Sequence, residues 1–402
     1  MRSPSFRTMP PDGGPLRVLV VGAGAMARVW LRAVLASPDT VLAGVVDLVP
    51  AAAEALVRRA GVPETPTGPE LAALATATRP DAVVDVTVPE AHLPVTLEAL
   101  SLGLPVLGEK PVAATLPEAL RLAAASEAAG ELFMVSQSRR YDRHLAALRD
   151  RVPLLGRPGI LTTDFFRAPH FGGFRETMAH PLLLDMAIHP FDTARWLLDA
   201  DPVSVRCEAY NPSWSWYAGD AAATAVFEMA GGIRYVYNGS WCSAGLETSW
   251  NGAWRLSGEL GSATWDGEHP PEVELCEVDA VPSSEGEAGQ AADAPQGVAD
   301  APQGVADAPQ GVAGALAEFV RALRTGTVPA GEVHGNVLSL AMVKAAVASA
   351  QRDRRVHIGP LIEEALTEAR KAATGPEAAR LHAWPSASEA LAATPRGLHR
   401  AG

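Results

Sequence analysis

The feature that most constrains the fold of this chain is a mostly apolar run that leads directly into a glycine-rich turn. Residues 16–21 are followed by Gly-Ala-Gly-Ala-Met-Ala at 22–27 and then by a helical pattern. Small residues at such a turn allow backbone N–H groups at a helix N-terminus to approach a pyrophosphate. Strand, glycine turn and helix in this order are typical of a dinucleotide-binding fold. We therefore expect cofactor contacts from Gly22, Gly24, Ala25 and Met26.

A carboxylate follows at the position that reads the adenosine ribose. Asp47 ends the next predicted strand, 20 residues beyond Ala27. A carboxylate at this point accepts hydrogen bonds from ribose hydroxyls and repels a 2′-phosphate. The sequence therefore favours NAD, with NADP possible. The alternative is a tight turn followed by an ordinary strand-end aspartate.

The chain of 402 residues is long enough for two domains with a cleft between them. Residues 16–150 alternate apolar strands with helical segments, which predicts an α/β Rossmann domain with a doubly wound parallel sheet. The predicted strands cover 16–21, 41–47, 82–88, 105–108 and 132–137. Residues 151–358 predict an α+β domain with a large, mostly antiparallel open sheet and one helix near 182–198. Six of the nine tryptophans lie in this second domain between Trp214 and Trp265, and core or interface packing is the expected role.

The remaining segments carry weaker signals. Residues 1–15 predict a flexible lead without a signal peptide. The sequence ADAPQGV occurs three times in tandem within 292–312, which predicts a low-complexity loop over about 281–312. Amphipathic helices are expected over 315–324 and 337–351, and the role of the 359–402 tail is unreadable.

Charge and composition exclude several classes of protein. A net charge of −13 argues against nucleic-acid or anionic-membrane binding, which depends on lysine and arginine. The three cysteines are widely spaced without a CxxC pair, so neither a disulfide framework nor a metal site is indicated. The chain has no uninterrupted apolar run of about 18 residues, the length that a membrane span needs. We expect a soluble, cytoplasmic protein that acts on a small molecule.

Two local patterns offer catalytic chemistry. Lys110 follows a short predicted strand, at the edge of the sheet where such folds bind ligands, and could stabilise a substrate oxygen. Asp185 and His189 are four residues apart, so one helix face would carry both, and the carboxylate would raise the basicity of a general-base imidazole. Pro190 predicts a kink beside His189. A solvated Lys-Pro turn and a helix-surface hydrogen bond are the plainer alternatives.

Taken in order, the glycine turn, Glu109-Lys110-Pro111 and Asp185 to His189 resemble the glucose–fructose oxidoreductase and inositol dehydrogenase (Gfo/Idh/MocA) family of NAD(P)-dependent enzymes. The resemblance covers about residues 16–358. It departs from the family pattern at Ala187, where glycine is usual, and at His180, where a glycine run often precedes the helix.

The resemblance also assigns roles to individual residues. It implies Lys110, Asp185 and His189 as the catalytic trio, and assembly of homodimers or homotetramers through the second sheet. The further cofactor contacts that it implies are Thr87, Pro89, His92, Glu109 and Lys110. The substrate contacts that it implies are Arg140 and Tyr141. The loop residue His170 is a further substrate candidate, although a solvated histidine is the plainer interpretation.

The expected function is hydride transfer between a nicotinamide and a carbon bearing a hydroxyl group on a sugar, cyclitol or similar polyol. Two alternatives remain open at this point. One is a non-catalytic NAD(P)-binding regulator on the same fold. The other is an NAD-dependent glycosidase or epimerase that oxidises its substrate only transiently. The exact substrate and the physiological direction are not encoded in any spacing.

Overall fold

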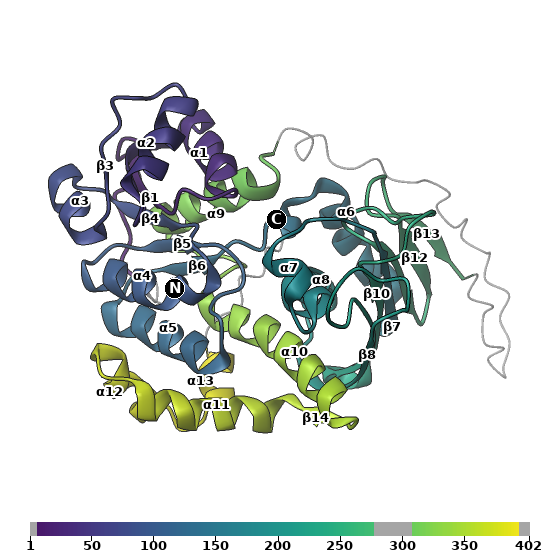
Figure 1. Cartoon of the computed structure of the whole chain (residues 1–402). Coiled ribbons are helices and arrows are strands. Elements are labelled where there is room, and N and C mark those ends of the chain that lie inside the picture. Colours follow the sequence, from purple (N-terminus) through teal and green to yellow (C-terminus); the bar gives the residue numbers. More distant parts are fainter. Residues whose placement is uncertain (1–5, 277–307, 394–402) are drawn as a thin grey trace, which may run out of the picture.

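The computed structural model describes residues 6–276 and 308–393 as two domains side by side (Figure 1). The first contains a six-stranded parallel sheet in the order β3-β2-β1-β4-β5-β6. Its strands are β1 (Leu16–Val21), β2 (Thr40–Val46), β3 (Thr67–Gly68), β4 (Ala82–Asp85), β5 (Val106–Gly108) and β6 (Phe133–Val135). Its helices are α1 (Ala27–Ala36), α2 (Pro50–Arg59), α3 (Leu71–Thr78), α4 (Pro89–Ser101) and α5 (Leu116–Ala129).

The five predicted strands of this domain are confirmed. They could be recognised in the sequence because they are apolar on both faces. Val83 and Val84 in β4 point to opposite sides of the sheet, and both side chains are fully buried. Each of the five occurs within a few residues of its predicted bounds. The two-residue β3 was missed, since so short an edge strand leaves no periodic pattern.

A short connection leads to the second domain through η1 (Ser138–Tyr141), α6 (Arg143–Arg151) and η2 (Val152–Leu155). The second sheet has eight strands in the order β13-β12-β11-β7-β10-β9-β8-β14, and all neighbours are antiparallel except β7 and β10. These strands are β7 (Pro158–Phe166), β8 (Pro202–Tyr210), β9 (Ala222–Met229), β10 (Arg234–Ser240), β11 (Ala253–Gly258), β12 (Gly261–Trp265), β13 (Glu272–Leu275) and β14 (Val356–His357). The α+β prediction is confirmed.

The sheet is accompanied by α7 (Phe174–Thr177), the π-helical turn η3 (Leu182–Met186), α8 (Ile188–Leu198) and η4 (Ala230–Gly232). Core packing is confirmed for Trp241, Trp254 and Trp265, which are at most 4% exposed. Trp214 and Trp250 remain 70% and 41% exposed, so the tryptophan-rich segment does not serve the core alone.

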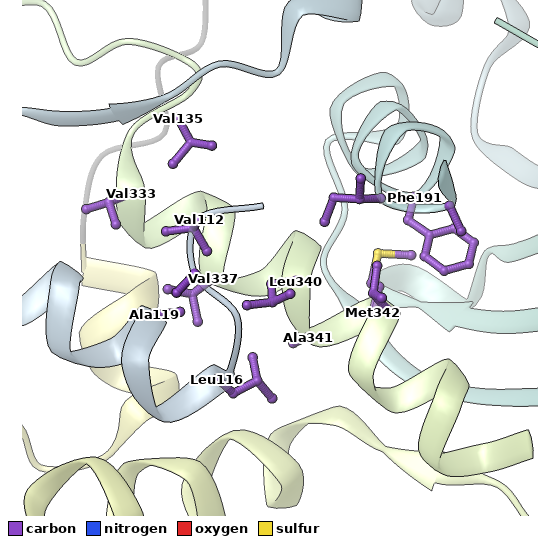
Figure 2. Packing of buried hydrophobic residues seen from close by; sticks show 14 of the residues in the cluster. Val112, Leu116, Ala119, Val135, Phe191, Val333, Val337, Leu340, Ala341 and Met342 are labelled. Carbon is purple, nitrogen blue, oxygen red and sulfur yellow. The ribbon is translucent and has the colours of Figure 1, made fainter. Parts of the chain in front are cut away.

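Helix α10 (Val333–Arg352) joins the two domains. Val337 and Leu340 face Leu116 of α5, and Met342 lies beside Phe191 of α8 (Figure 2). Within the described part of the chain, this is the one helix long and apolar enough to cross a membrane, but 72% of its apolar window is buried inside the protein. We therefore interpret α10 as a core helix.

A helix that the sequence assigned to the second domain packs on the first domain instead. Helix α9 (Gly311–Thr325) packs against α1 and η1, and its Phe319 and Leu323 join the core of the first sheet. Gly311 and Val312, expected in the repeat loop, form the first turn of α9. Residues 281–307 of that predicted loop lie outside the described residues.

The N-terminal lead is attached to the first domain where it is described. Phe6 is buried in the same core, and Arg7 Nε donates to Glu131 Oε1 at 2.6 Å. Phe6 and Arg7 thus lie against the first domain, the predicted flexibility of the lead stays a prediction, and residues 1–5 lie outside the described range.

The region predicted as a tail folds into three helices along α5 and α10, as Figure 1 shows. They are α11 (Ile358–Ala372), α12 (Pro376–Ala383) and α13 (Ala387–Ala393). Arg121 of α5 binds Glu377 of α12 at 2.9 Å, and the Glu377 side chain is 2% exposed. Residues 359–393 thus cover the first domain, and residues 394–402 lie outside the described range.

A buried imidazole connects α5, α10 and these last helices. His334 Nδ1 lies 2.7 Å from Glu332 Oε1, and its Nε2 lies 2.8 Å from Glu127 Oε1. Trp384, which follows α12, donates from Nε1 to the second oxygen of Glu127 at 3.1 Å. Burial alone lowers the pKa of His334, but the two carboxylates outweigh it and raise the pKa to about 10.

The raised pKa of His334 makes the folding stability depend on pH. Its contribution is fully present below pH 6.5, the ordinary histidine pKa, and is lost as the pH rises through about 10. We expect the urea midpoint of the wild type to fall between pH 7 and pH 10.5 more than that of His334→Gln. The matched control His382→Gln, an exposed histidine on α12, should retain the wild-type pH dependence. Parallel pH curves for wild type and His334→Gln would contradict this.

Candidate active site

The glycine turn after β1 has the geometry that a close backbone approach requires. Gly22 has φ +105°, and a Cβ there would come within 2.9 Å of the Val86 carbonyl oxygen. A Cβ at Gly24 would meet nothing within 4 Å, so this side of the turn is open. Ala27 is fully buried, which fits the packing role of the third small residue. The N-terminus of α1 has no side-chain cap, so its N–H groups can bind an anion.

Asp47 lies beside this turn at the end of β2. Its Oδ2 accepts a hydrogen bond from the Ala23 N–H at 2.7 Å, and its Oδ1 accepts one from the Val49 N–H at 2.8 Å. The exposed Ala25 and Met26 complete the rim of the turn. Together these residues fit a dinucleotide whose pyrophosphate lies on the helix N-terminus and whose ribose lies at Asp47.

Other predicted cofactor residues hold the loops of this edge in place. His92 is 2% exposed, and its ring nitrogens lie 2.8 and 3.2 Å from the carbonyl oxygens of Pro111 and Thr87. Thr87 Oγ1 donates to the buried Asp85 at 2.6 Å, and Pro89 forms the first turn of α4. The polar groups of the His92 and Thr87 side chains are thus engaged in hydrogen bonds within the protein.

Glu109 also supports the edge from inside. Its Oε1 accepts from Trp30 Nε1 at 2.7 Å, and its Oε2 accepts from the Lys110 N–H at 3.1 Å. The side chain is buried, and the following Lys110–Pro111 peptide bond is cis. Glu109 therefore acts by positioning the backbone at Lys110.

Lys110 extends from the carboxyl end of β5 to the second domain. Its Nζ donates to the backbone carbonyl of Asp185 at 3.0 Å and to Asp185 Oδ1 at 3.1 Å. An ammonium group has three N–H donors, so one remains for a substrate oxygen. The two side chains are 19% and 21% exposed, which leaves the pair accessible. The structure thus brings together two of the three predicted catalytic residues.

A second cation shares the Asp185 carboxylate. Arg175 Nε, from α7, donates to Asp185 Oδ2 at 2.6 Å, and its guanidinium lies over the rings of Phe171 and Phe174. Burial alone raises the pKa of Asp185, but Lys110 and Arg175 outweigh it and hold the pKa below its ordinary value. Asp185 is ionised at neutral pH and holds Lys110 in a fixed position.

The predicted helix face that would carry Asp185 and His189 together is wrong. The Ala187 N–H donates to the Leu182 carbonyl five residues back, so Asp185 lies in a π-helical turn, and α8 starts afresh at Ile188. Among the described residues no hydrogen bond joins Asp185 to His189. The break in the helix falls at Ala187, and Pro190 lies in the first turn of α8, where its missing N–H costs no hydrogen bond.

His189 is a neutral base. Its Nδ1 is buried and has no hydrogen-bond partner among the described residues. Burial, followed by the nearby charges of Arg139 and Lys110, lowers the pKa of His189 well below 6.5. The expectation that Asp185 raises the basicity of His189 is therefore wrong, because Lys110 and Arg175 occupy that carboxylate. His189 is uncharged at pH 7 and can accept a proton.

The arginine predicted to contact substrate is bound inside the protein. Arg140 donates from Nε and Nη2 to both oxygens of Asp192, at 2.7 and 2.5 Å, and from Nη1 to the Ala330 carbonyl. Tyr141 donates its hydroxyl to Glu318 of α9. Both side chains stabilise the junction between η1, α8 and α9, and the substrate roles expected for Arg140 and Tyr141 stay a prediction that these internal contacts do not favour.

His170 lies in an exposed loop, where its ring stacks on Trp216 with centroids 3.8 Å apart. The next residue, Phe171, contacts the guanidinium of Arg175, which in turn binds Asp185. The loop therefore reaches the neighbourhood of Asp185, and a substrate contact from His170 stays a prediction.

Comparison with known proteins agrees with both domains. Residues 16–137 match the model of the oxidoreductase family with an NAD-binding Rossmann fold, and residues 154–264 match the GFO/IDH/MocA C-terminal domain. The two matches together cover more than half of the chain. The chain belongs to this family. The fold and the resemblance expected from the sequence are confirmed, and the first domain is the NAD-binding Rossmann domain of the family.

Individual relatives match over part of their length. An inositol 2-dehydrogenase of Paracoccus denitrificans is 33% identical over 198 residues, covering 48% of this chain and 56% of the relative. A 1,5-anhydro-D-fructose reductase of Ensifer adhaerens is 32% identical over 164 residues, covering 39% and 47%. The chain thus spans about half the length of these curated relatives.

The solved structures extend the likeness of fold over most of the chain. An oxidoreductase from Agrobacterium radiobacter, solved with NAD+, L-tartaric acid and magnesium, has a TM-score of 0.71 at 18% identity and covers 86% of this chain and 99% of that one. The WlbA dehydrogenase of Bordetella pertussis, solved with NADH and UDP-GlcNAcA, has a TM-score of 0.68 at 18% identity and covers 85% and 98%.

Two residues of this family member's site were missed from the sequence. Arg175 lies in α7, a four-residue helix too short to show a periodic pattern, and only its contact with Asp185 identifies it. Arg139 was passed over in favour of Arg140, although Arg139 is the one whose charge acts on His189. A pair of adjacent arginines in a short turn points in two directions, and the sequence does not say which one faces the site.

Proposed function

We propose that this protein is an NAD-dependent dehydrogenase that transfers hydride between the nicotinamide and a carbon bearing a hydroxyl group on a sugar, cyclitol or similar polyol. The observation that carries the proposal is the contact of Lys110 Nζ with Asp185, beside the neutral His189, at the carboxyl edge of the Rossmann sheet. Hydride transfer from an alcohol needs a group that stabilises negative charge on the oxygen and a base that accepts the hydroxyl proton. Lys110 and His189 offer these two functions at this edge.

The cofactor would be held by the first domain. Gly22, Gly24 and the N-terminus of α1 would bind the pyrophosphate, and Asp47 would accept hydrogen bonds from the ribose. Bound NAD supplies the hydride acceptor or donor. The open space at Gly24 and the uncapped helix are the features that fit this group.

The catalytic residues divide the remaining work. The free N–H of Lys110 donates to the substrate oxygen and stabilises negative charge that develops there. His189 accepts the hydroxyl proton in the oxidising direction and returns it in the reducing direction. Asp185 binds Lys110 through two oxygens and fixes its direction, and Arg175 keeps Asp185 ionised. Relatives named for inositol and for anhydrofructose support the polyol class of substrate.

The test is an assay of the wild type with NAD or NADP and a panel of sugars, cyclitols and polyols, with reduced nicotinamide followed by absorbance. We expect turnover with NAD and at least one polyol, and none without the polyol. Saturable NAD binding without turnover, and without exchange of isotope between substrate and solvent, would overturn the proposal in favour of a non-catalytic binding protein. Isotope exchange without net reduction would indicate transient oxidation instead.

Asp47 sets the cofactor preference. Asp47→Asn keeps an oxygen that can accept hydrogen bonds but removes the negative charge that repels a 2′-phosphate. We expect the ratio of kcat/KM for NAD to that for NADP to fall about tenfold, equivalent to about 1.4 kcal/mol. Asp39→Asn, on the loop before β2, is the control. An unchanged ratio would remove Asp47 from the specificity argument.

The lowered pKa of His189 fixes the acid side of the pH profile. Because the imidazole is neutral until the pH falls well below 6.5, we expect kcat/KM for oxidation to stay level from pH 8 to pH 6.5 and to decline only below that. Initial rates between pH 5 and pH 9 measure this. An acid limb centred at or above pH 6.5 would contradict the assignment of His189 as the base.

Assembly and location complete the proposal. Strand β7 lies in the middle of the second sheet, yet its Ile160 and Asp164 are exposed, so this sheet has an open face. We place a homodimer or homotetramer contact on that face and the protein in the cytoplasm. Light scattering of the wild type and of Ile160→Lys tests the contact.

A further inference from the structure

Two adjacent arginines in η1 differ in one respect that bears on the substrate. Arg140 donates from Nε and Nη2 to the two carboxylate oxygens of Asp192. This carboxylate outweighs the cost of burial and raises the pKa of Arg140. Arg139 has no carboxylate within ion-pair distance among the described residues, and its one side-chain hydrogen bond is to Met186 Sδ at 3.7 Å. Burial lowers the pKa of Arg139 to about 10, so it remains charged at neutral pH.

The unpaired guanidinium belongs to the catalytic neighbourhood. Met186 is the residue after Asp185 in the π-helical turn, so the contact with Met186 places Arg139 beside that turn. The charge of Arg139 also acts on His189, where it lowers the pKa together with Lys110. Arg139 is therefore close to the two groups that would handle the substrate oxygen and its proton.

The carboxylates around this turn are bound by other groups. Asp185 holds Lys110 and Arg175, Glu109 accepts from Trp30, and Asp192 holds Arg140. Glu176 accepts from the Gly172 N–H. Arg139 is partly exposed, unlike the buried Arg140, so a ligand can reach its guanidinium. A largely buried cation without a counter-charge is still costly. Such an unpaired cation is expected in a binding site, where an anionic ligand offsets the free-energy cost when it binds.

Further polar atoms near Arg139 also lack partners. The hydroxyl of Tyr237 on β10 is buried without a hydrogen bond, as is His189 Nδ1. Tyr237 is close enough to Arg139 for the two groups to affect each other's pKa. The nicotinamide ring cannot serve as the counter-ion, because it carries no negative charge in either redox state. An anionic group of the substrate would supply the charge that Arg139 lacks.

From this arrangement we infer that the substrate is an anionic sugar derivative, with a carboxylate or phosphate group bound by Arg139 while Lys110 and His189 act on its hydroxyl. The inference rests on the proposed function for the chemistry at the hydroxyl. It adds to it the charge of the substrate and the residue that selects that charge. A guanidinium binds a carboxylate or a phosphate through two parallel hydrogen bonds, so the anion also fixes the orientation of the sugar.

The experiment compares matched probes in the presence of saturating NAD. D-Glucuronate and D-glucose 6-phosphate are the anionic probes, and D-glucose and myo-inositol are the neutral ones. We expect the wild type to show at least tenfold higher kcat/KM for one anionic probe than for the neutral probes, and the responding probe distinguishes carboxylate from phosphate. Arg139→Met should lower kcat/KM for that probe by about 10- to 100-fold, mainly through KM, and change the neutral probes less than threefold.

Two further variants separate binding from structure. Arg139→Lys keeps the charge and should recover part of the loss, whereas Arg206→Met removes an exposed arginine of β8 and should change nothing. A wild type that prefers neutral probes, or an Arg139→Met variant that loses all probes equally, would overturn the inference.

A binding measurement keeps the inference distinct from the proposed function. The shift of the melting temperature on adding each probe to the NAD-loaded protein is measured for wild type and Arg139→Met. A shift with an anionic probe that is lost in Arg139→Met supports the inference even if no NADH forms, in which case the proposed hydride transfer alone fails. Equal shifts with charged and neutral probes, or none with either anion, would overturn it.

Discussion

Lys110→Met should lower kcat/KM by about 10²- to 10³-fold while the Kd for NAD changes less than threefold. Methionine keeps most of the length of the side chain but removes the ammonium group that donates to Asp185 and to the substrate oxygen. Loss of one donor to a developing oxyanion costs about this factor in enzymes that stabilise such a charge. Steady-state rates with the best polyol of the panel, and NAD titration by fluorescence, measure the two quantities.

The chain offers a matched control for this variant. Lys371 lies exposed near the end of α11, away from β5, so Lys371→Met removes the same charge without touching the site. It should retain wild-type kinetics. Retention of more than a third of the wild-type kcat/KM in Lys110→Met would reject Lys110 as a catalytic residue, and a joint loss of NAD binding would indicate a structural role.

Asp192→Asn should destabilise the protein by about 3–5 kcal/mol. The substitution leaves the Arg140 guanidinium buried without its counter-ion, and the side chains of this ion pair are only 7% and 2% exposed. The Ser339 hydroxyl also loses a charged acceptor, since it donates to Asp192 Oδ1 at 2.6 Å. Urea unfolding followed by circular dichroism measures the change.

A surface pair of the same chemistry is the control. Arg206 binds Asp353 at 2.6 Å, but the side chain of Asp353 is 91% exposed, so Asp353→Asn should cost less than about 1 kcal/mol. The double variant Arg140→Met/Asp192→Asn should be more stable than Asp192→Asn alone, because it removes the unpaired charge. Equal losses for the buried and the exposed pair would contradict this account.

The parts of the fold that the sequence predicted are those whose signals are local. The glycine turn, Asp47 and the strands of the first sheet follow from residues that are neighbours in the chain, and the nearly continuous apolar runs show that the strands are buried on both faces. The structure and role of the 359–402 tail could not be predicted, because the signal there is not local. The apolar face of α11 is buried against α5, more than 200 residues earlier, and no local pattern reveals that partner.

The same distinction applies to the candidate site. Lys110 and Asp185 were both predicted, but the spacing of four residues between Asp185 and His189 suggested a contact that the π-helical turn prevents. Their true partners come from elsewhere in the chain: Lys110 and Arg175 for Asp185, and Arg139 for the electrostatics of His189. Side-chain direction in a short turn and hydrogen-bond register in a helix are set by packing, which the sequence does not display.

The placement of α9 on the first domain has a consequence for synthesis on the ribosome. The first sheet is complete once residue 135 is made, but Phe319 and Leu323, which complete its core, follow almost 190 residues later. At about 5–20 residues per second, the nascent domain waits on the order of ten seconds or more with that apolar face uncovered. During this interval a holding chaperone has a defined surface to bind on the growing chain: the face later covered by α9.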